Sequence, residues 1–219
     1  MANKPIFFSL LSLVILASIS LPVVFYIFNS GDFYGREVSM QAPEFELLKT
    51  DNKTHQLSEH RGKFVFLYFG YLNCDDVCHN QVGVMFNINH QTSNQDLDFI
   101  FVTMDPKRDS NEMLNDYFNQ FGQNFTALTA TTMQQVQKIA AQYKAPFFAT
   151  GSTQAEKDYE IAHPGSIFLI DPKGEIRVVY QNQYLRYDMI IEDLNLLRIE
   201  LKTQTHAKSN SAFGADLKS

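Results

Sequence analysis

The sequence predicts an α/β domain built on a mixed β-sheet. Two apolar runs, Lys63–Phe69 and Leu97–Met104, are rich in β-branched and aromatic residues, as buried strands are. Each is followed by a segment with helical spacing, which indicates parallel strands joined by helical crossovers. In Ser166–Tyr180, two apolar stretches flank an Asp-Pro-Lys-Gly turn and predict an antiparallel hairpin. Crossovers and a hairpin together make the sheet mixed.

The remaining elements follow from shorter signals. Two early strands should flank the Asp51-Asn52-Lys53 turn, and a short strand fits "FTALTA". Helices are expected at four places: Val77 to His90; a segment capped by Asp109 or Ser110 and ended by Gly122; a segment opened by the capping-box pair Thr131 and Gln134; and a closing amphipathic helix over residues 187–202.

Composition limits the class of protein. The chain has 219 residues, 45% hydrophobic and 19% charged, which suits one folded domain plus an anchor. The net charge of -6 gives no basic surface, so nucleic acid is excluded as a partner. We expect a cytoplasmic tip and transmembrane anchor in residues 1–30, a linker in 31–41, the α/β domain in 42–202 and a polar flexible tail in 203–219.

The N-terminal segment predicts the compartment. Pro5 to Phe28 carries no charge and exceeds the roughly 20 residues that cross a bilayer as a helix. Lys4 precedes it and Asp32 follows it, so the N-terminus should be cytoplasmic. Ser18 and Ser20 leave a cleaved signal peptide open, although the apolar run is long for one. The domain would face the periplasm in a bacterium, or a mitochondrial intermembrane space, where disulfides can form.

The two cysteines of the chain, Cys74 and Cys78, stand where the strand ending at Gly70 gives way to a helix. Backbone N–H groups at a helix start stabilise a thiolate, and residues four apart share one helix face. The pair therefore fits a dithiol, a disulfide or a two-thiolate metal site. Thiolates favour Cu(I), which commonly takes an imidazole as a further ligand.

Six histidines are available as that ligand. His55, His60 and His90 are expected on the surface, His206 in the tail carries no signal, and His79 is an alternative ligand beside Cys78. His163 stands in a loop directly before a buried strand, close to where the ends of neighbouring strands meet. From spacing alone, a ligand and an ordinary loop histidine both remain open for it.

Three separated motifs resemble the Sco/SenC family, the membrane-tethered, thioredoxin-like proteins of cytochrome c oxidase assembly. "FLYFGYLNCDDVCHNQ" is similar to its C-x-x-x-C segment, matching at Gly70, Tyr71, Cys74, Asp76, Val77 and Cys78. "FVTMDPKRDS" resembles its D-P-x-R-D turn, with matches at Asp105, Pro106, Arg108 and Asp109. In "DYEIAHPGSIFLIDPKGEI", His163 occupies the place of the family's copper-binding histidine.

The resemblance implies a thioredoxin-like fold and a copper site formed by Cys74, Cys78 and His163. The expected metal is Cu(I), with Cu(II) left open. The implied function is delivery of Cu(I) to the binuclear copper centre of cytochrome c oxidase subunit II, with a periplasmic thiol reductant or copper donor as a further partner. The domain would then be tethered to the inner membrane, facing the periplasm.

Several positions depart from the family pattern. Asp75 and His79 replace prolines, and Pro164 replaces the usual Ser or Thr after the histidine. Asp75 and Asp76 are expected to raise the pKa of the nearby thiols, and Asp76 to orient the loop or act as a helix-start carboxylate. Asp105 and Arg108 are expected to hold their turn.

A thiol–disulfide oxidoreductase, attacking through Cys74 and resolving through Cys78, is the alternative function, so whether the chain is an enzyme stays open. A tethered scaffold with an incidental disulfide is a third interpretation.

Overall fold

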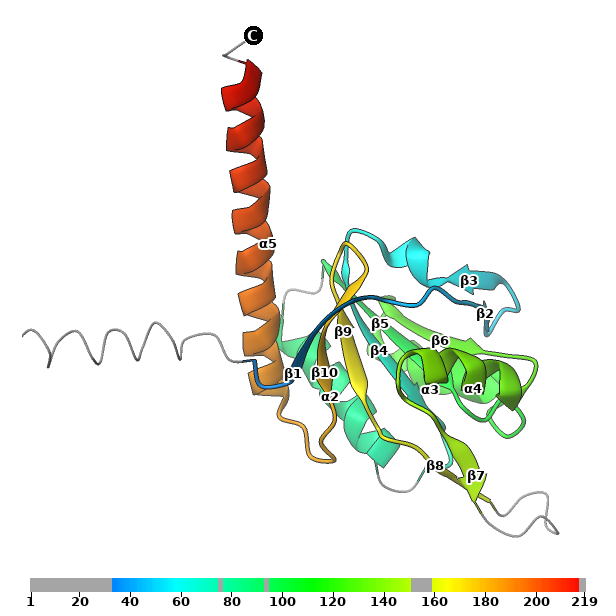
Figure 1. Cartoon of the computed structure of the whole chain (residues 1–219). Coiled ribbons are helices and arrows are strands. Elements are labelled where there is room, and N and C mark those ends of the chain that lie inside the picture. Colours follow the sequence, from blue (N-terminus) through cyan, green and yellow to red (C-terminus); the bar gives the residue numbers. More distant parts are fainter. Residues whose placement is uncertain (1–32, 75–76, 93–94, 151–158, 217–219) are drawn as a thin grey trace, which may run out of the picture. The chain divides into compact units, whose positions relative to one another are not determined.

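An eight-stranded mixed sheet organises the chain, of which the structure, a computed structural model, describes residues 33–74, 77–92, 95–150 and 159–216. The strand order is β1-β10-β9-β4-β5-β6-β2-β3, and β7 and β8 form a separate pair (Figure 1). The strands are β1 Arg36–Gln41, β2 Glu46–Lys49, β3 Thr54–Gln56, β4 Phe64–Gly70, β5 Leu97–Thr103, β6 Phe125–Thr129, β7 Phe148–Thr150, β8 Glu160–Ala162, β9 Ile167–Ile170 and β10 Glu175–Tyr180. The helices are α2 Val77–Gln91, α3 Asn111–Phe118, α4 Met133–Gln142 and α5 Tyr187–Asp216, with 3-10 turns η1 Leu57–His60 and η2 Asn119–Phe121.

Strand β4 lies in the middle of the sheet. It pairs in parallel with β5 from Phe64 to Gly70 and antiparallel with β9, where Tyr68 is opposite Ile167. Every residue of β4 and of β5 is buried. Such continuous apolar strands are typical of parallel sheets covered on both faces, and they explain why the sequence shows no alternation here.

Helices cover both faces of the sheet. Helix α2 contacts α5, and its His79 and Phe86 rings lie against Tyr117 and Phe121, so α2, α3 with η2, and α5 share one face. Tyr143, at the end of α4, packs on Phe69 and Phe168. Successive residues of a strand point to opposite faces, so Phe69 and its neighbour Tyr68 lie on different faces of the sheet. Helix α4 therefore covers the face opposite to that of Tyr68.

The parallel strands β4 and β5 end side by side, which brings two loops together. Gly70 ends β4, and a side chain there would stand 2.6 Å from the Tyr68 ring and 2.8 Å from the Phe101 ring. The Gly70 carbonyl accepts a 2.7 Å hydrogen bond from the Met104 N–H just beyond β5. A glycine is therefore required where the two chains approach, and the loops that follow start as neighbours.

The predicted α/β class, the two buried strands, the hairpin and the helices are confirmed. Ser110 caps α3 as expected, through a 3.2 Å bond from Met113 N–H. The cap of α4 is Thr132, which accepts from Gln135 N–H, and not Thr131. The capping-box spacing was therefore placed one residue too early.

Two predicted boundaries are corrected. Residues 31–41 were expected to form a linker, but β1 pairs antiparallel with β10, and the Tyr34 and Gly35 N–H groups donate to the Asp193 carboxylate. Strand β1 is mostly exposed and lacks apolar alternation, which hid it from the sequence. Residues 203–219 were expected as a flexible tail, but α5 continues to Asp216. No proline interrupts α5, and polar residues such as Thr203 bond back to the preceding turn.

The expected membrane anchor, Pro5 to Phe28, falls outside the described residues. Within the part of the chain that the structure describes, no helix has both the length and the apolar character needed to span a bilayer.

His55 and His60, expected on the surface, are buried at the end of the sheet where β4 and β5 begin. Their Nε2 atoms are 2.8 Å apart. His60 Nδ1 is 2.7 Å from the Asp98 carboxylate, and His55 Nδ1 is 3.1 Å from that of Glu59. Because carboxylates only accept, each of these carboxylates takes its hydrogen bond from the ring nitrogen beside it. Lys63, 2.9 Å from Asp98, adds a positive charge.

We predict that the buried His55 makes the free energy of unfolding depend on pH. Burial lowers the pKa of His55 in the folded chain, so below the ordinary histidine pKa of about 6.5 the unfolded chain binds a proton that the folded chain does not. Stability should therefore fall between pH 7 and 5, by up to about 1.4 kcal/mol per pH unit. Denaturant unfolding of the full chain across this range measures it.

In this experiment the variant His55→Gln should flatten the profile, while the exposed-histidine control His90→Gln should keep it. Identical slopes for the wild type and His55→Gln would contradict the prediction.

Candidate functional site

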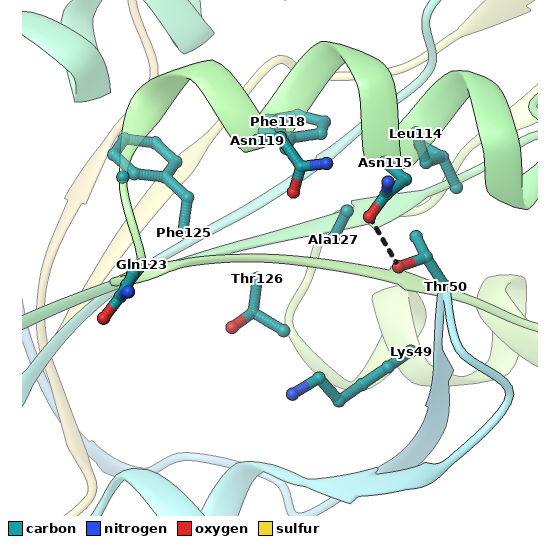
Figure 2. A pocket seen from close by; sticks show the side chains of 11 residues that line it. Lys49, Thr50, Leu114, Asn115, Phe118, Asn119, Gln123, Phe125, Thr126 and Ala127 are labelled. Atoms are coloured by element: carbon teal, nitrogen blue, oxygen red, sulfur yellow. Dashed lines mark hydrogen bonds between the residues drawn. The ribbon is translucent and has the colours of Figure 1, made fainter.

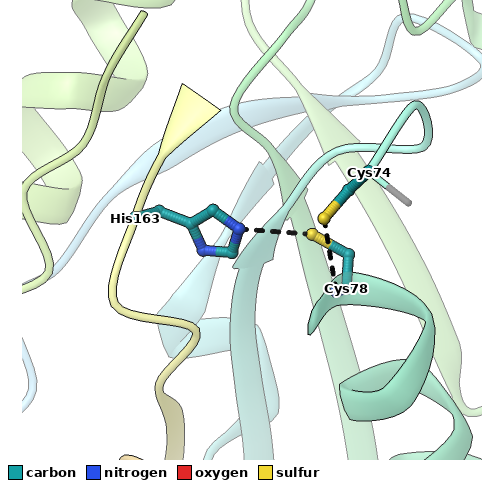
Figure 3. Close-up of side chains that lie close together, drawn as sticks. All are labelled: Cys74, Cys78 and His163. Carbon is teal, nitrogen blue, oxygen red and sulfur yellow. Dashed lines mark hydrogen bonds between the residues drawn. The ribbon is translucent and has the colours of Figure 1, made fainter. Parts of the chain in front are cut away.

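Cys74, Cys78 and His163 converge at the end of the sheet where β4 and β5 finish (Figure 3). One ligand atom from each lies within 4.8 Å of the other two. His163 Nε2 is 3.4 Å from Cys78 Sγ. The structure thus brings together the three residues that the sequence singled out, although they are up to 89 positions apart along the chain.

The two cysteines reach the site from the loop after β4 and from the start of α2. Both are free thiols, with Cys74 6% and Cys78 2% exposed. The Cys78 N–H donates to Cys74 Sγ at 3.4 Å. A helix-start amide therefore points at the Cys74 sulfur, as the sequence position predicted, and favours negative charge on it.

Cys78 differs from Cys74 in its protonation. Its thiol is hydrogen-bonded to Cys74, and this bond together with burial raises the pKa of Cys78 far above the usual range of a thiol. Cys78 therefore remains a protonated thiol in the metal-free protein. The pair is divided into a sulfur that accepts a backbone N–H and a sulfur that keeps its proton.

The His163 imidazole is oriented by its own turn. Gly165 N–H donates to Nδ1 at 3.2 Å, and Gly165 has a positive φ of 63°. Because Nδ1 accepts, the hydrogen of the neutral ring is on Nε2, which faces Cys78. The ring stands edge-on against Tyr71, with centroids 5.9 Å apart.

A buried carboxylate holds the cysteine loop. Asp109 is 1% exposed, and its two oxygens accept the Leu72 N–H at 3.1 and 3.2 Å. Thr103 Oγ1 donates to the same group at 2.5 Å. Burial raises the pKa of Asp109 to about 6, although these two hydrogen bonds act in the opposite direction. Leu72 is two residues before Cys74, so Asp109 fixes the path of the chain into the site.

The turn after β5 is held as expected. Asp105, which is fully buried, accepts from Arg108 through both the side-chain Nε–H and the backbone N–H. Neither residue belongs to the group of clustered ligand atoms. Their expected role, holding the turn, agrees with this geometry.

The other candidates lie outside the cluster. His79 is exposed and 3.3 Å from the Tyr117 hydroxyl, so it does not join the three ligands. His90 is exposed, as expected. Asp75 and Asp76 lie outside the described residues, so their expected effects on the thiols stay predictions. Pro164 is exposed and leads from His163 into the Gly165 turn.

A separate pocket lies between α3 and the β2–β6 edge of the sheet (Figure 2). It has a volume of about 350 Å³, and Thr50 Oγ1 is 3.5 Å from Asn115 Oδ1 across it. Its lining comprises Lys49, Thr50, Leu114, Asn115, Phe118, Asn119, Gly122, Gln123, Phe125, Thr126 and Ala127. None of these is a cysteine or histidine, so this pocket offers no soft metal ligands.

Two thiols and one imidazole form a soft donor set. Thiolate sulfur selects Cu(I) and other soft ions, and a neutral imidazole nitrogen suits copper as well. The three atoms are close enough to bind one ion, and all three are half-buried or buried. The same two sulfurs are also close enough to exchange between dithiol and disulfide. The residues therefore fit both copper binding and thiol chemistry.

Fold and site together define a thioredoxin-like protein with a Cys-x-x-x-Cys and histidine site at the end of its central strand. The chain belongs to the SCO1/SenC family, whose model matches residues 35–197. A SCO2-like protein of Rickettsia prowazekii is 29% identical over 149 residues, which is 66% of this chain and 72% of that protein. The chain spans between 65% and 72% of the length of this and two other curated relatives.

Solved structures agree with the family assignment. Apo Sco1 from Thermus thermophilus superposes with a TM-score of 0.68, and the match covers 77% of this chain and 99% of that protein. The two sequences are 22% identical, so this likeness shows the fold alone. Yeast Sco1, solved with copper bound, is 26% identical with a TM-score of 0.58 and covers 71% of this chain and 88% of its own. The predicted family and the thioredoxin-like fold are confirmed.

Several residues that support the site were not predicted. Tyr159 and Glu160 belong to the short strand β8 and its approach, in a stretch that the sequence presented as a polar loop. Asp109 was considered as a helix cap and as part of the D-P-x-R-D motif, but its bond to the Leu72 N–H was not predicted. Its place at the end of the D-P-x-R-D motif is the sequence signal that could have found this role.

We predict that the two thiols differ in reactivity. In the reduced, metal-free full chain, iodoacetamide should modify Cys74 at least about tenfold faster than Cys78, because one pKa unit changes the thiolate fraction tenfold. Peptide mass spectrometry after brief alkylation measures the ratio. In denaturant the two rates should become alike, and equal rates in the folded protein would contradict the assignment.

Proposed function

We propose that this chain binds Cu(I) through Cys74, Cys78 and His163 and delivers it to the binuclear copper centre of cytochrome c oxidase subunit II. The observation that carries the proposal is the convergence of these three ligand atoms within 4.8 Å. Family membership supports it, as does the copper bound to the related yeast Sco1. Copper is here a cargo, held and then released.

Copper binding requires hydrogens to leave two of the three ligand atoms. Cys78 must lose the proton that its bond to Cys74 and its burial retain, so loading releases a proton. His163 must free Nε2, which carries the hydrogen in the metal-free arrangement, and the Gly165 N–H bond to Nδ1 opposes that change of tautomer. The tautomer cost makes the histidine a more exchangeable ligand.

Release would proceed on the histidine side. His163 is half-buried, whereas both sulfurs are almost fully covered. An incoming ligand of the acceptor therefore reaches the ion most easily by replacing the imidazole first. The thiolates would follow one at a time, so the ion is never left without a ligand.

The location of the protein remains part of the proposal. We infer that residues 1–30 tether the domain to a membrane, with the N-terminus cytoplasmic and the site in the periplasm or an intermembrane space. The support is the uncharged segment from Pro5 to Phe28. A periplasmic donor or thiol reductant would keep Cys74 and Cys78 reduced for loading.

A second candidate function is thiol–disulfide exchange with the copper-ligand cysteines of the partner. It is favoured by the asymmetry of the pair, in which Cys74 accepts a helix-start N–H and Cys78 keeps its proton. Cys74 would attack the partner's disulfide, and Cys78 would then release the partner dithiol and leave a Cys74–Cys78 disulfide. Such exchange does not need His163.

We predict that each of the three residues contributes to Cu(I) affinity. In anaerobic competition titrations of the reduced full chain, the wild type should bind one Cu(I). His163→Ala should weaken it at least about tenfold, or 1.4 kcal/mol, and Cys74→Ser or Cys78→Ser more, since a hydroxyl is a poor ligand for a soft ion.

The matched control in this titration is His79→Ala, which removes an exposed histidine next to Cys78 and should leave the affinity unchanged. If the wild type bound no Cu(I) more tightly than the cysteine variants, copper delivery would be contradicted. Tight binding indifferent to His163 would favour the thiol-exchange function instead.

A further inference from the structure

We propose that Arg108 and Tyr159 are positioning residues that hold His163 at the copper site. Neither belongs to the cluster of the three ligand residues. Both belong to a network that joins the turn after β5 to the segment that carries His163. The proposal rests on the proposed copper function and adds which residues set the place of the third ligand.

Tyr159 is held at three points by one turn. Its hydroxyl donates to Asp105 Oδ1 at 2.6 Å. Its carbonyl accepts from Arg108 Nη1 at 2.8 Å. The Arg108 guanidinium lies over its ring, 3.8 Å from the centroid, which is a close cation–π contact. Arg108 is itself fixed to the buried Asp105. The turn therefore contacts Tyr159 at its hydroxyl, at its carbonyl and at one face of its ring.

Because Tyr159 is fixed, the nearby His163 is restricted in position as well. Tyr159 directly precedes β8, and His163 directly follows it. Strand β8 pairs only with β7 within the described residues, and so gains no register from the main sheet. Three residues of extended chain leave little freedom between an anchored Tyr159 and the imidazole.

Tyr71, in the cysteine loop, makes a second connection to the segment that carries His163. Its hydroxyl donates to Glu160 at 2.7 Å and accepts from the Ile161 N–H at 3.4 Å. Its ring faces the His163 edge. The Arg108 guanidinium also lies 5.7 Å from the Tyr71 ring centroid, so the same cation is close to both Tyr71 and Tyr159. Arg108 is therefore the point where the cysteine loop and the histidine segment are fastened together.

The chemistry of Arg108 is specific to this role. A guanidinium is planar, so it can donate along its edge while its face lies on an aromatic ring. A lysine ammonium keeps the charge but offers neither the flat face nor the fork. Arg108→Lys should therefore behave like Arg108→Gln, whereas a purely electrostatic role would be preserved in the lysine variant.

The test is a double-mutant cycle on Cu(I) affinity in the reduced full chain. We expect Arg108→Gln and Arg108→Lys each to weaken binding about tenfold, the usual scale for residues that orient a ligand. Tyr159→Phe, which keeps the ring and loses the Asp105 bond, should have a smaller effect. In a His163→Ala background the Arg108 variants should have no further effect, because they act through the imidazole.

A readout without copper accompanies the cycle. In NMR spectra of the metal-free protein, the His163 ring signals should shift in Arg108→Gln as the imidazole moves away from the Tyr71 ring. The matched control is Arg177→Gln. Arg177 is 11% exposed, against 15% for Arg108, and pairs with Asp171 and Glu200 beyond the other end of β9. It should change neither the His163 signals nor the affinity.

Three results would overturn the positioning role. These are wild-type affinity in Arg108→Gln, an equal loss of affinity in the His163→Ala background, or unmoved His163 signals. Failure of the proposed function is distinct from these, because it would appear as absence of tight Cu(I) binding in the wild type itself.

Discussion

The pairing of β4 with β9 is the constraint on which the site depends. The two strands run antiparallel, with Tyr68 opposite Ile167. The chain that leaves β4 and the chain that enters β9 therefore meet at the same end of the sheet. Cys74 follows Tyr68 by six residues and His163 precedes Ile167 by four, so both extend past this end from adjacent strands. A shift of register in this pair would separate the sulfurs from the imidazole.

The parallel pairing of β4 with β5 adds the supporting layer. Because β5 ends beside β4, the turn that follows it brings Asp105, Arg108 and Asp109 to the same edge. Asp109 fixes the cysteine loop through Leu72, and Arg108 fixes the histidine segment through Tyr159. The turn after β5 therefore supports both the cysteine loop and the histidine segment. The cysteine loop and the histidine segment form a defined site because a third segment binds both.

The sequence predicted the parts of this arrangement that have strong local signals. Continuous apolar runs marked β4 and β5, and the Asp-Pro-Lys-Gly turn marked the β9–β10 hairpin. Cys74 and Cys78 were found from their place at a helix start, whereas His163 was singled out firmly only by the family resemblance. Strand β1 and the pair β7–β8 were missed because their residues are mostly exposed and depend on partners far along the chain. The burial of His55 and His60 depends on Asp98, 38 residues from His60, which no local pattern reveals.

The central claim is that one Cu(I) ion is held by two sulfurs and one imidazole nitrogen. Copper K-edge X-ray absorption of the reduced full chain loaded with one equivalent of Cu(I) tests it most directly. The account predicts two sulfur scatterers and one nitrogen scatterer per copper, with the multiple-scattering pattern of an imidazole that vanishes in His163→Ala. A spectrum with sulfur scatterers alone, or with copper–copper scattering from ions shared between chains, would contradict it.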